Sequence, residues 1–265
     1  MIESIVLGTI QGIAEWLPVS SEGLIFLIKA NFFNNGESIK EIASLALFLH
    51  GGTFLAALVY FRKDVWRLIK ALFDFREAEN ADKKTLLFLI ITTALTGVFG
   101  YSLLLVIDGI NLEKINYATK IITFLIGLLL LVTAFLQLAI KKKGQKNQEL
   151  IDNGDGVVLG LVQSLAVLPG LSRSGLTVAA LLFRNFQDSS ALKLSFLMSL
   201  PVILGGNIVL NFNKFSFNNF YFVGFLFAFV FGLITIDLFL KLARKLNLGY
   251  FVFIFGLLMV VASFI

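Results

Sequence analysis

Long apolar stretches dominate the chain, and their lengths determine which elements it can form. A helix that crosses the roughly 30 Å of hydrocarbon in a bilayer needs about 20 consecutive apolar residues. Six stretches meet that length, at roughly 41–61, 85–107, 117–140, 190–211, 219–240 and 248–265. The pattern therefore predicts an all-α polytopic membrane protein with six transmembrane helices.

Two shorter apolar stretches, 5–18 and 156–169, each end at a proline that small polar residues follow. Apolar segments of about 14 residues are too short to cross a bilayer and are typical of re-entrant segments. We therefore expect two re-entrant helical hairpins. Glu3 stands where a secretory signal has basic residues, so the first segment is expected to be retained.

The two short stretches also resemble each other. VLGTIQGIAEWLPVSSEGL (6–24) aligns with VLGLVQSLAVLPGLSRSGL (158–176), with Gln11 opposite Gln163. The chain is thus interpreted as an internal duplication in which each half holds one broken hairpin and three spans. Because three is odd, the second half must lie upside down relative to the first, which makes an inverted-topology repeat.

We expect a single membrane domain, with repeat 1 over about 1–140, repeat 2 over about 156–265 and a cytoplasmic linker at 141–155. The linker, KKKGQKNQELIDNGD, is interpreted as a solvated loop in contact with anionic lipid.

The distribution of positive charge tests whether the short segments are re-entrant. If they are, Lys and Arg divide 16 to 4 between the two faces, whereas full crossing by both segments would give 12 to 8. The positive-inside rule therefore favours re-entrance and places both chain ends outside. The loops expected in the cytoplasm are 62–84, 141–155, 184–193 and 241–247.

Composition agrees with a membrane protein. Of 265 residues, 58% are hydrophobic and only 15% charged, whereas soluble domains carry about 25% charged residues. The chain has no cysteine, which excludes disulfides, thiolate catalysis and cysteine metal sites. The net charge of +5 reports orientation in the membrane, and no nucleic-acid partner is expected.

Candidate chemistry lies at the two hairpin tips. Non-helical backbone at membrane depth occurs only where protein buries it or where it lines a cavity, so the tips mark a cavity. Each tip has a polar cluster just before a renewed apolar helix: Ser20, Ser21, Glu22 and Gly23 in the first, and Ser172, Arg173, Ser174 and Gly175 in the second.

Both tips are therefore helix N-termini, where free N–H groups and a partial positive charge favour anions. Serine hydroxyls can donate further hydrogen bonds, and the glycines permit tight turns. The fork of Arg173 matches the oxygens of a phosphate group. Phosphate is the best-fitting ligand.

Several of these residues also have a structural interpretation. Arg173 would pair with an acid or with carbonyl groups, although an intramembrane arginine is a functional residue by default, and serines commonly cap helices. Glu15, the only acid in the apolar body of either short segment, either neutralises Arg173 or serves in proton transfer or metal coordination. Gln11 lies one turn earlier on the same face, where it could bind substrate or a metal-bound water.

His50 is the only histidine and lies inside the first full span. A single histidine cannot build a multi-histidine metal site, so packing or a hydrogen bond between helices is the preferred interpretation. A proton shuttle is the alternative. For Asp108 and Asp237, we expect pairing with neighbouring polar groups.

Two segments resemble a known family. QGIAEWLPVSSEG (11–23) and LPGLSRSGLT (168–177) are similar to the two signature segments of the bacitracin-resistance family of undecaprenyl-diphosphate phosphatases, in order, spacing and separation. LALFLHGGTFLAALVYFRKD (45–64) is similar to that family's first long span. The resemblance implies a cell-membrane enzyme that removes the terminal phosphate of a polyprenyl diphosphate, regenerating the carrier used for surface polymers. It also implies a site that opens on the outer face and is assisted by a divalent metal, Mg²⁺ or Ca²⁺.

The resemblance extends to individual positions. It implies that Glu15 is the acidic residue of the first motif, that Ser20 and Ser21 are its paired serines, and that the second motif comprises Ser172, Arg173, Ser174 and Thr177. Two positions depart from the family pattern, since many members have histidine at Leu24 and glutamate at Gln11. The departures remove an imidazole and one carboxylate that could serve catalysis and metal binding, for which Glu22 is a candidate substitute.

The leading hypothesis is hydrolysis of a polyprenyl diphosphate whose charged head lies between the two tips. Arg173 and the tip N–H groups would stabilise charge on the phosphoryl oxygens. Ser21 would attack or orient a water, with Glu15 as base or Mg²⁺ ligand. If the fold brings His50 to the tips, it would donate a proton to the leaving phosphate. Substrate contacts are expected from Gln11, Ser20, Ser172, Ser174, Gly175 and Thr177.

Two rival hypotheses share the same pocket. Secondary carriers are also built from inverted repeats with broken helices, which favours a polyprenyl-phosphate flippase or transporter. A non-catalytic lipid-phosphate binding protein is the third alternative. The expected partners are the lipid substrate, membrane lipids and, in a homodimer, a second copy of the chain.

Overall fold

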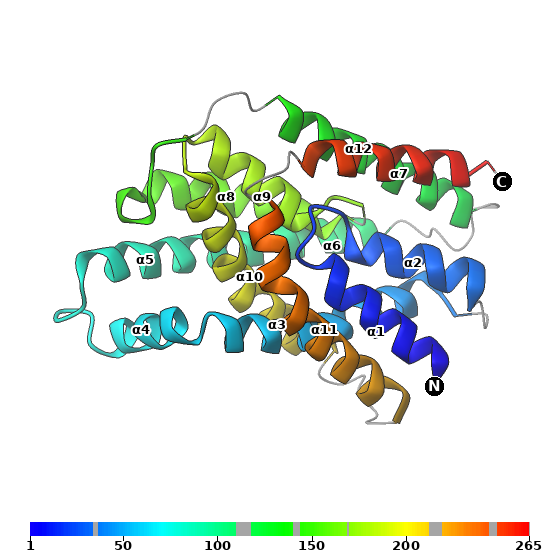
Figure 1. Ribbon diagram of the computed structural model, residues 1–265, viewed down its shortest axis with the longest axis horizontal. Helices are drawn as coiled ribbons and strands as arrows, with labels where there is room; N and C mark the ends of the chain where they lie inside the picture. Colours follow the sequence, from blue (N-terminus) through cyan, green and yellow to red (C-terminus); the bar gives the residue numbers. More distant parts are fainter. Residues whose placement is uncertain are drawn as a thin grey trace.

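The computed structural model describes residues 1–33, 37–109, 118–139, 144–168, 170–211, 219–243 and 248–264. Within these ranges the chain is helical and forms no β-sheet (Figure 1). The α-helices are α1 (Ile2–Ala14), α2 (Ser21–Phe32), α3 (Ile39–Tyr60), α4 (Arg62–Phe73), α5 (Asn80–Leu95), α6 (Tyr101–Asp108), α7 (Ala118–Leu138), α8 (Asn153–Ser164), α9 (Arg173–Phe183), α10 (Asp188–Asn211), α11 (Asn219–Ala243) and α12 (Leu248–Ala262). Outside the described residues lie Pro169, Lys114, Lys214 and parts of the loops 141–155 and 241–247.

The predicted architecture of an all-α polytopic membrane protein is confirmed. Helices long and apolar enough to cross a membrane cover Glu41–Tyr60, Asn80–Ile107, Lys120–Leu138, Asp188–Leu210 and Phe220–Leu242. The sixth predicted span, 248–265, corresponds to α12, whose apolar part Gly249–Ala262 is shorter within the described residues. Large apolar side chains such as Phe135 and Ile234 lie exposed on these helices, as they do on helices that face lipid.

The predicted span 85–107 is one rod with an interruption. A π-helical turn, Thr96–Gly100, joins α5 to α6. The Thr96 hydroxyl donates to the carbonyl of Gly160 on α8 at 3.2 Å, and the Gln163 amide donates to that hydroxyl at 3.1 Å. These bonds fix α8 against the irregular turn, and they give Gln163 a structural role.

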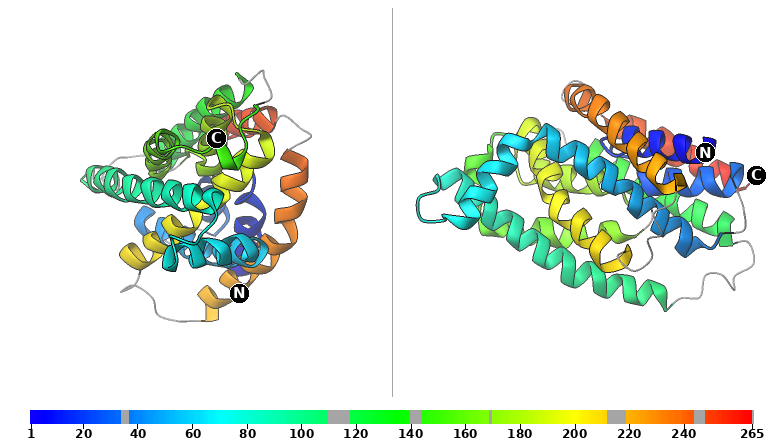
Figure 2. Two further views of the ribbon diagram at one scale, coloured as in Figure 1. Left: turned by 90° about the vertical axis from the view of Figure 1, so that its left-hand side faces the viewer. Right: turned by 90° about the horizontal axis from the view of Figure 1, so that it is seen from below.

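The first helix of each half packs against a helix of the other half. α1 packs against α11 of the second half, and α8 packs correspondingly against α5 of the first (Figures 1 and 2). α7 and α12, the last helices of the two halves, pack against each other. This exchange between the halves is compatible with an internal duplication. The duplication itself and the orientation of each half in the membrane stay predictions.

Glycine makes the contact between α1 and α11 possible. A Cβ atom on Gly8 would lie 2.2 Å from the carbonyl oxygen of Gly224, and one on Gly12 would lie 2.7 Å from the amide nitrogen of Gly232. The two backbones therefore approach more closely than any larger residue allows. This contact holds α1, and with it the first hairpin tip, against the second half of the molecule.

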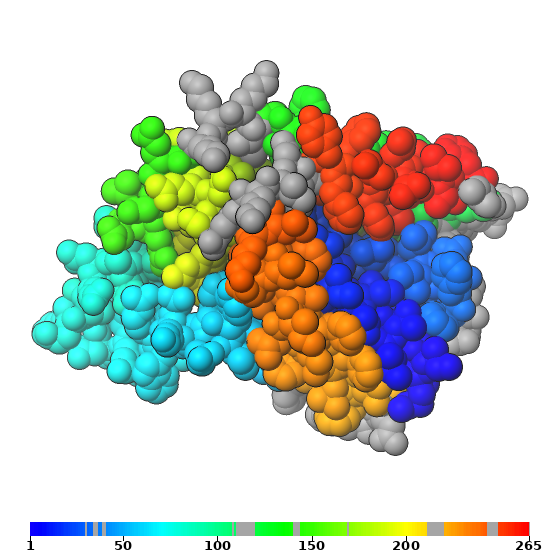
Figure 3. All heavy atoms as spheres, viewed as in Figure 1, coloured from blue at the N-terminus to red at the C-terminus, as the bar shows by residue number. Residues whose placement is uncertain are grey.

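The two chain ends and the basic hairpin between α4 and α5 lie at opposite ends of the long axis (Figures 1 and 3). Near the basic end, the described part of the linker is held by charge. Lys146 pairs with Asp152 at 3.1 Å and also with buried Asp155, which accepts from Nε of Arg184 at 2.7 Å. This part of the linker is therefore fixed onto the end of α9, and α8 begins at Asn153, before the predicted start at 156.

Candidate functional site

The two hairpin tips have the same local frame. α1 ends at Ala14, and after a short turn Ser20 caps α2 by accepting a hydrogen bond from the amide of Gly23 at 3.1 Å. Ser172 caps α9 in the same way, accepting from the amide of Gly175 at 3.1 Å. A helix restarts at each tip as predicted, but it begins inside the polar cluster, at Ser21 and Arg173, and not after it. The capping role of these two serines is confirmed.

The tips touch each other directly. The Ser174 hydroxyl donates to the carbonyl of Leu17 in the first tip at 2.8 Å. A Cβ atom on Gly175 would lie 3.1 Å from the carbonyl oxygen of Pro18 and 2.6 Å from a methyl group of Thr133, so this position has room for glycine alone. Gly170, with a φ of +103°, allows the sharp turn that leads into α9.

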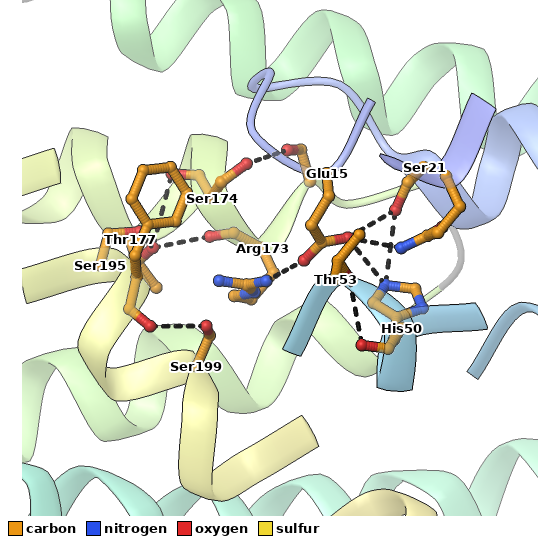
Figure 4. A network of polar contacts seen from close by, with 12 residues as sticks. Glu15, Ser21, His50, Thr53, Arg173, Ser174, Thr177, Ser195 and Ser199 are labelled. Atoms are coloured by element: carbon orange, nitrogen blue, oxygen red, sulfur yellow. Dashed lines mark hydrogen bonds and ion pairs between the residues drawn. The ribbon is translucent and has the colours of Figure 1, made fainter. Parts of the chain in front are cut away.

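Glu15 is the centre of the polar network between the tips (Figure 4). Its Oε1 accepts from Nη2 of Arg173, which confirms the predicted pairing across the two halves. Its Oε2 accepts from the amide of Gln11 at 2.8 Å and from the hydroxyl of Ser21 at 3.1 Å. Glu15 is almost completely buried, so this carboxylate depends on these partners for the stabilisation that water would otherwise provide.

His50 reaches the same network from α3. Its Nδ1 lies 2.7 Å from the carbonyl oxygen of Ala46, one turn earlier in the helix. Its Nε2 lies 3.1 Å from Oε2 of Glu15 and 3.4 Å from Oγ of Ser21. The imidazole therefore makes a hydrogen bond within its own helix, and it also lies within reach of the Ser21 hydroxyl, the expected nucleophile.

A pocket with an empty volume of about 310 Å³, including its open mouth, lies between the tips. Within the described part of the chain, Nη1 of Arg173 is buried beside the pocket and has no hydrogen-bond partner. A buried guanidinium nitrogen without a partner is costly unless a ligand supplies an acceptor. The lining residues are Glu15, Val19, Ser20, Ser21, Glu22, His50, Ala166, Leu171, Ser172, Arg173 and Ser174.

The pocket is therefore arranged to hold an anion. Two helix N-termini point their first turns toward it, and the free edge of Arg173 can donate to oxygen atoms. Ser21 is a nucleophile candidate whose hydroxyl already donates to a carboxylate. This combination suits the transfer of a phosphoryl group.

The donor set fits a protein-held divalent metal poorly. Among the described residues, no three histidine, aspartate or glutamate side chains gather as a metal-binding set. The oxygens of Glu15 already accept from Arg173, His50, Gln11 and Ser21, and a metal ion bound there would lie against the guanidinium. We therefore derive no step of the reaction through a metal.

Three predicted contact residues, Gln11, Gly175 and Thr177, lie outside the pocket lining. Gln11 is completely buried behind Glu15, which it holds in place, and its Oε1 has no partner among the described residues. Thr177 turns away from the pocket and bonds to the hydroxyl of Ser195 on α10 at 2.7 Å. The Gly175 carbonyl accepts from the amide of Gln137 on α7 at 3.4 Å. These residues support the site from behind.

Sequence reasoning did not find Ala46, Gln137 or Ser195. Ala46 acts through its backbone, and the other two are single polar residues in apolar helices without a motif. Asp237 accepts from Tyr60 at 2.8 Å and pairs with Lys241 at 2.6 Å, as the structural interpretation predicted. The side chain of Asp108 lies outside what the structure describes.

Comparisons with known proteins point in one direction. The model of the family described as bacitracin resistance protein BacA matches residues 4–261. The undecaprenyl-diphosphatase of Methanococcoides burtonii is 40% identical over 269 residues, which cover 99% of this chain and 98% of that protein. The undecaprenyl-diphosphatases of Methanococcus maripaludis strain C6 and Thermosipho africanus are 35% and 34% identical, and each alignment covers at least 98% of both chains.

Proposed function

Because the chain belongs to the bacitracin resistance protein BacA family, we propose that it hydrolyses undecaprenyl diphosphate to the monophosphate and inorganic phosphate. The reaction returns the lipid carrier to the synthesis of cell-envelope polymers. The named relatives are diphosphatases that match nearly the whole chain. Neither a flippase nor a non-catalytic binding protein is favoured over this activity.

One observation carries the proposal at the level of the site. Arg173 is held by Glu15 through one nitrogen, while its other terminal nitrogen lies buried at the pocket with no partner in the described structure. A phosphate oxygen would provide the missing acceptor. The pocket that contains this nitrogen also contains Ser21, so a diphosphate bound to Arg173 would have its phosphorus next to a nucleophile.

The roles of the site residues follow from this placement. Arg173 and the N-terminal amides of α2 and α9 stabilise the negative charge that develops on the phosphoryl oxygens. Ser21 attacks the terminal phosphorus, and Glu15, which already accepts the hydrogen of that hydroxyl, takes its proton. The two tips that bind the diphosphate are held in shape by three serines. Ser20 and Ser172 cap the helices, and Ser174 bonds one tip to the other.

Steady-state phosphate release from undecaprenyl diphosphate by the purified protein in detergent tests the proposal. Arg173→Ala should lower the rate of phosphate release about a hundredfold or more. Arg67→Ala, which removes an exposed arginine beside Asp64, is the matched control and should retain activity. If the natural protein binds the lipid and releases no phosphate, the proposed activity is wrong. If Arg173→Ala remains active, the role given to Arg173 is wrong.

The protein is an integral membrane protein, and its sidedness is part of the proposal. The basic loops lie in the cytoplasm, whereas both chain ends and the mouth of the site lie outside, as the 16 to 4 division of positive charge suggests. The two halves form one domain as inverted repeats, joined by the linker 141–155. Single cysteines introduced at the chain ends or in the linker test this arrangement. In intact cells, a reagent that does not cross the membrane should label cysteines at the chain ends and not those in the linker.

We further propose a homodimer, which would appear as a doubled mass in light scattering of the purified protein.

A divalent metal is proposed from the family resemblance. The ion would be held chiefly by the oxygens of the diphosphate, because this set of side chains does not fit it. Phosphate release in the presence of a chelator, and then with Mg²⁺ restored, tests the metal, and unchanged release in chelator would contradict it.

A further inference from the structure

The hydrogen bonds of His50 define where its protons lie. A carbonyl oxygen can only accept, so Nδ1, at 2.7 Å from the oxygen of Ala46, carries a hydrogen. The carboxylate of Glu15 is paired with Arg173 and is likewise an acceptor, so Nε2, at 3.1 Å, donates to it. The resting imidazole therefore carries a hydrogen on each nitrogen, and the Nε2 hydrogen lies at the pocket.

The hydroxyl of Ser21 shares the same acceptor. Its Oγ donates to Oε2 of Glu15 at 3.1 Å and lies 3.4 Å from Nε2 of His50. One carboxylate oxygen thus holds both the hydrogen of the nucleophile and the hydrogen of the imidazole. When Oε2 takes the serine proton, its negative charge is lost, and its hold on the imidazole proton weakens.

We propose that His50 is a catalytic residue of this site, which gives its Nε2 proton to the departing lipid monophosphate and afterwards takes a proton from water. The inference rests on the proposed hydrolysis and deepens it, because it assigns the acid that the reaction needs. His50 lines the pocket together with Ser21 and Arg173, so its Nε2 can contact a bound diphosphate.

In the first half-reaction, Oγ of Ser21 bonds to the terminal phosphorus, and the bond from that phosphorus to the bridging oxygen breaks. The Ser21 proton passes to Glu15, and the Nε2 proton of His50 passes to the bridging oxygen, which leaves on the lipid monophosphate. His50 is then neutral, with its remaining hydrogen still donated to Ala46.

The second half-reaction restores every group. A water oxygen bonds to phosphorus, and one of its protons goes to Nε2 of His50 while the other remains on the released phosphate. The bond between phosphorus and Oγ of Ser21 breaks, and Oγ recovers its proton from Glu15. The sum is lipid diphosphate plus water giving lipid monophosphate and phosphate, with His50, Glu15 and Ser21 in their starting states.

Many members of the family have a histidine at the position of Leu24, and the surroundings of Leu24 show that this position does not serve the pocket here. Leu24, one turn after the tip of α2, packs against the apolar cluster that includes Leu17 and Ile25 and does not line the pocket. Among the described residues, His50 is therefore the imidazole available to the diphosphate.

Replacing His50 by alanine and by glutamine separates a catalytic role from a positioning role. Glutamine can still donate a hydrogen bond to Glu15, but it cannot transfer a proton. We expect His50→Gln to lower kcat for undecaprenyl diphosphate about a hundredfold or more, with KM within about threefold, and to be as impaired as His50→Ala. If His50→Gln keeps kcat within tenfold of the natural protein, or loses activity only through KM, the inference is overturned.

The control is a neighbour on the same helix. Thr53 is buried, donates to the backbone oxygen of His50 at 3.1 Å and does not line the pocket. Thr53→Val should keep kcat within about threefold, and thermal unfolding in detergent should show that all three variants are folded. If the natural protein itself releases no phosphate, the proposed activity fails, whereas active natural protein with active His50→Gln defeats this inference alone.

Discussion

The two hairpin tips share one backbone frame and carry opposite chemistry. In each tip a serine caps the helix and a glycine follows three residues later, at Gly23 and Gly175. Between them, the first tip has Ser21 where the second has Arg173. The first tip therefore supplies the nucleophile and, just before it, Glu15, while the second supplies the cation. A duplicated frame fixes where the helices begin, and a few substitutions decide what each copy does.

The tips differ at two positions, Ser21 against Arg173 and Glu22 against Ser174. Exchanging the first pair is the strongest way to break this comparison. Ser21→Arg combined with Arg173→Ser keeps the composition of the site and moves each group to the other tip. Because Glu15 and His50 lie within hydrogen-bonding reach of the hydroxyl at position 21, we expect phosphate release to fall about a thousandfold or more. Phosphate release and thermal unfolding are measured together. Activity near that of the natural protein would show that the tips are interchangeable.

An intermediate effect is expected when the tip glycines are replaced, one at a time, by alanine, because the added methyl groups meet different neighbours in the two tips. On Gly175 the methyl would lie 2.6 Å from a methyl group of Thr133 and 3.1 Å from the backbone oxygen of Pro18, so both α7 and the first tip would have to move, costing about 1–3 kcal/mol of stability. On Gly23 its nearest obstacle is a methyl group of Ile126 at 2.9 Å, and the next neighbours lie at 3.4 Å. Both glycines lie in the first turn of a helix, so the better helix propensity of alanine offsets about 1 kcal/mol at each. Thermal unfolding should therefore rank Gly175→Ala below Gly23→Ala. The reverse order would mean that the tight packing around Gly175 is unimportant for stability.

The smallest expected effect concerns how the two repeated helices begin. α1 starts without a side-chain cap, whereas Asp152 caps α8 by accepting from the amide of Asp155 at 2.8 Å. That backbone hydrogen bond, together with Lys146, holds the pKa of Asp152 below its ordinary value despite some desolvation. Ionised Asp152 therefore stabilises the fold above its unfolded-state pKa of about 4, and this contribution is lost as the pH falls through the lower folded-state pKa.

Asp152→Asn should accordingly lower the free energy of unfolding at pH 7 by roughly a few tenths of a kcal/mol, and the melting temperature slightly. The effect is small because Asp152 is largely exposed and asparagine also caps helices. Below about pH 4 the melting temperatures of the two proteins should converge. Thermal unfolding across pH 3 to 8 in detergent measures the difference. A gap that widens with acidity would contradict the role given to this carboxylate.

Much of the architecture could be predicted from the sequence, because it depends on the lengths of apolar stretches. Residues 41–61 and 117–140 are long enough to span, whereas 5–18 is not, and the helices begin where the polar clusters predict. The pairing of Glu15 with Arg173 was also predictable. Glu15 is the only acid in the apolar body of either short segment, and Arg173 is the only positive charge in either tip cluster. The two similar motifs place both residues beside one expected cavity.

The remaining details depend on packing that the sequence does not encode locally. Nothing around His50 shows that α3 brings it beside Ser21, because the contact joins residues 29 positions apart through the packing of α3 against α2. The motif containing Thr177 does not show which face of α9 turns to the pocket, and the hydroxyl instead bonds Ser195. The π-helical turn at Thr96–Gly100 likewise follows from contact with α8.

The hydrogen bond from Ser174 to Leu17 and the pairing of Glu15 with Arg173 make the two copies dependent on each other. Neither tip holds a complete set of reactive groups by itself, because the hydroxyl and the carboxylate come from one and the guanidinium from the other. A damaging substitution in one half therefore has no backup in the other, and likeness of backbone brings no redundancy of function.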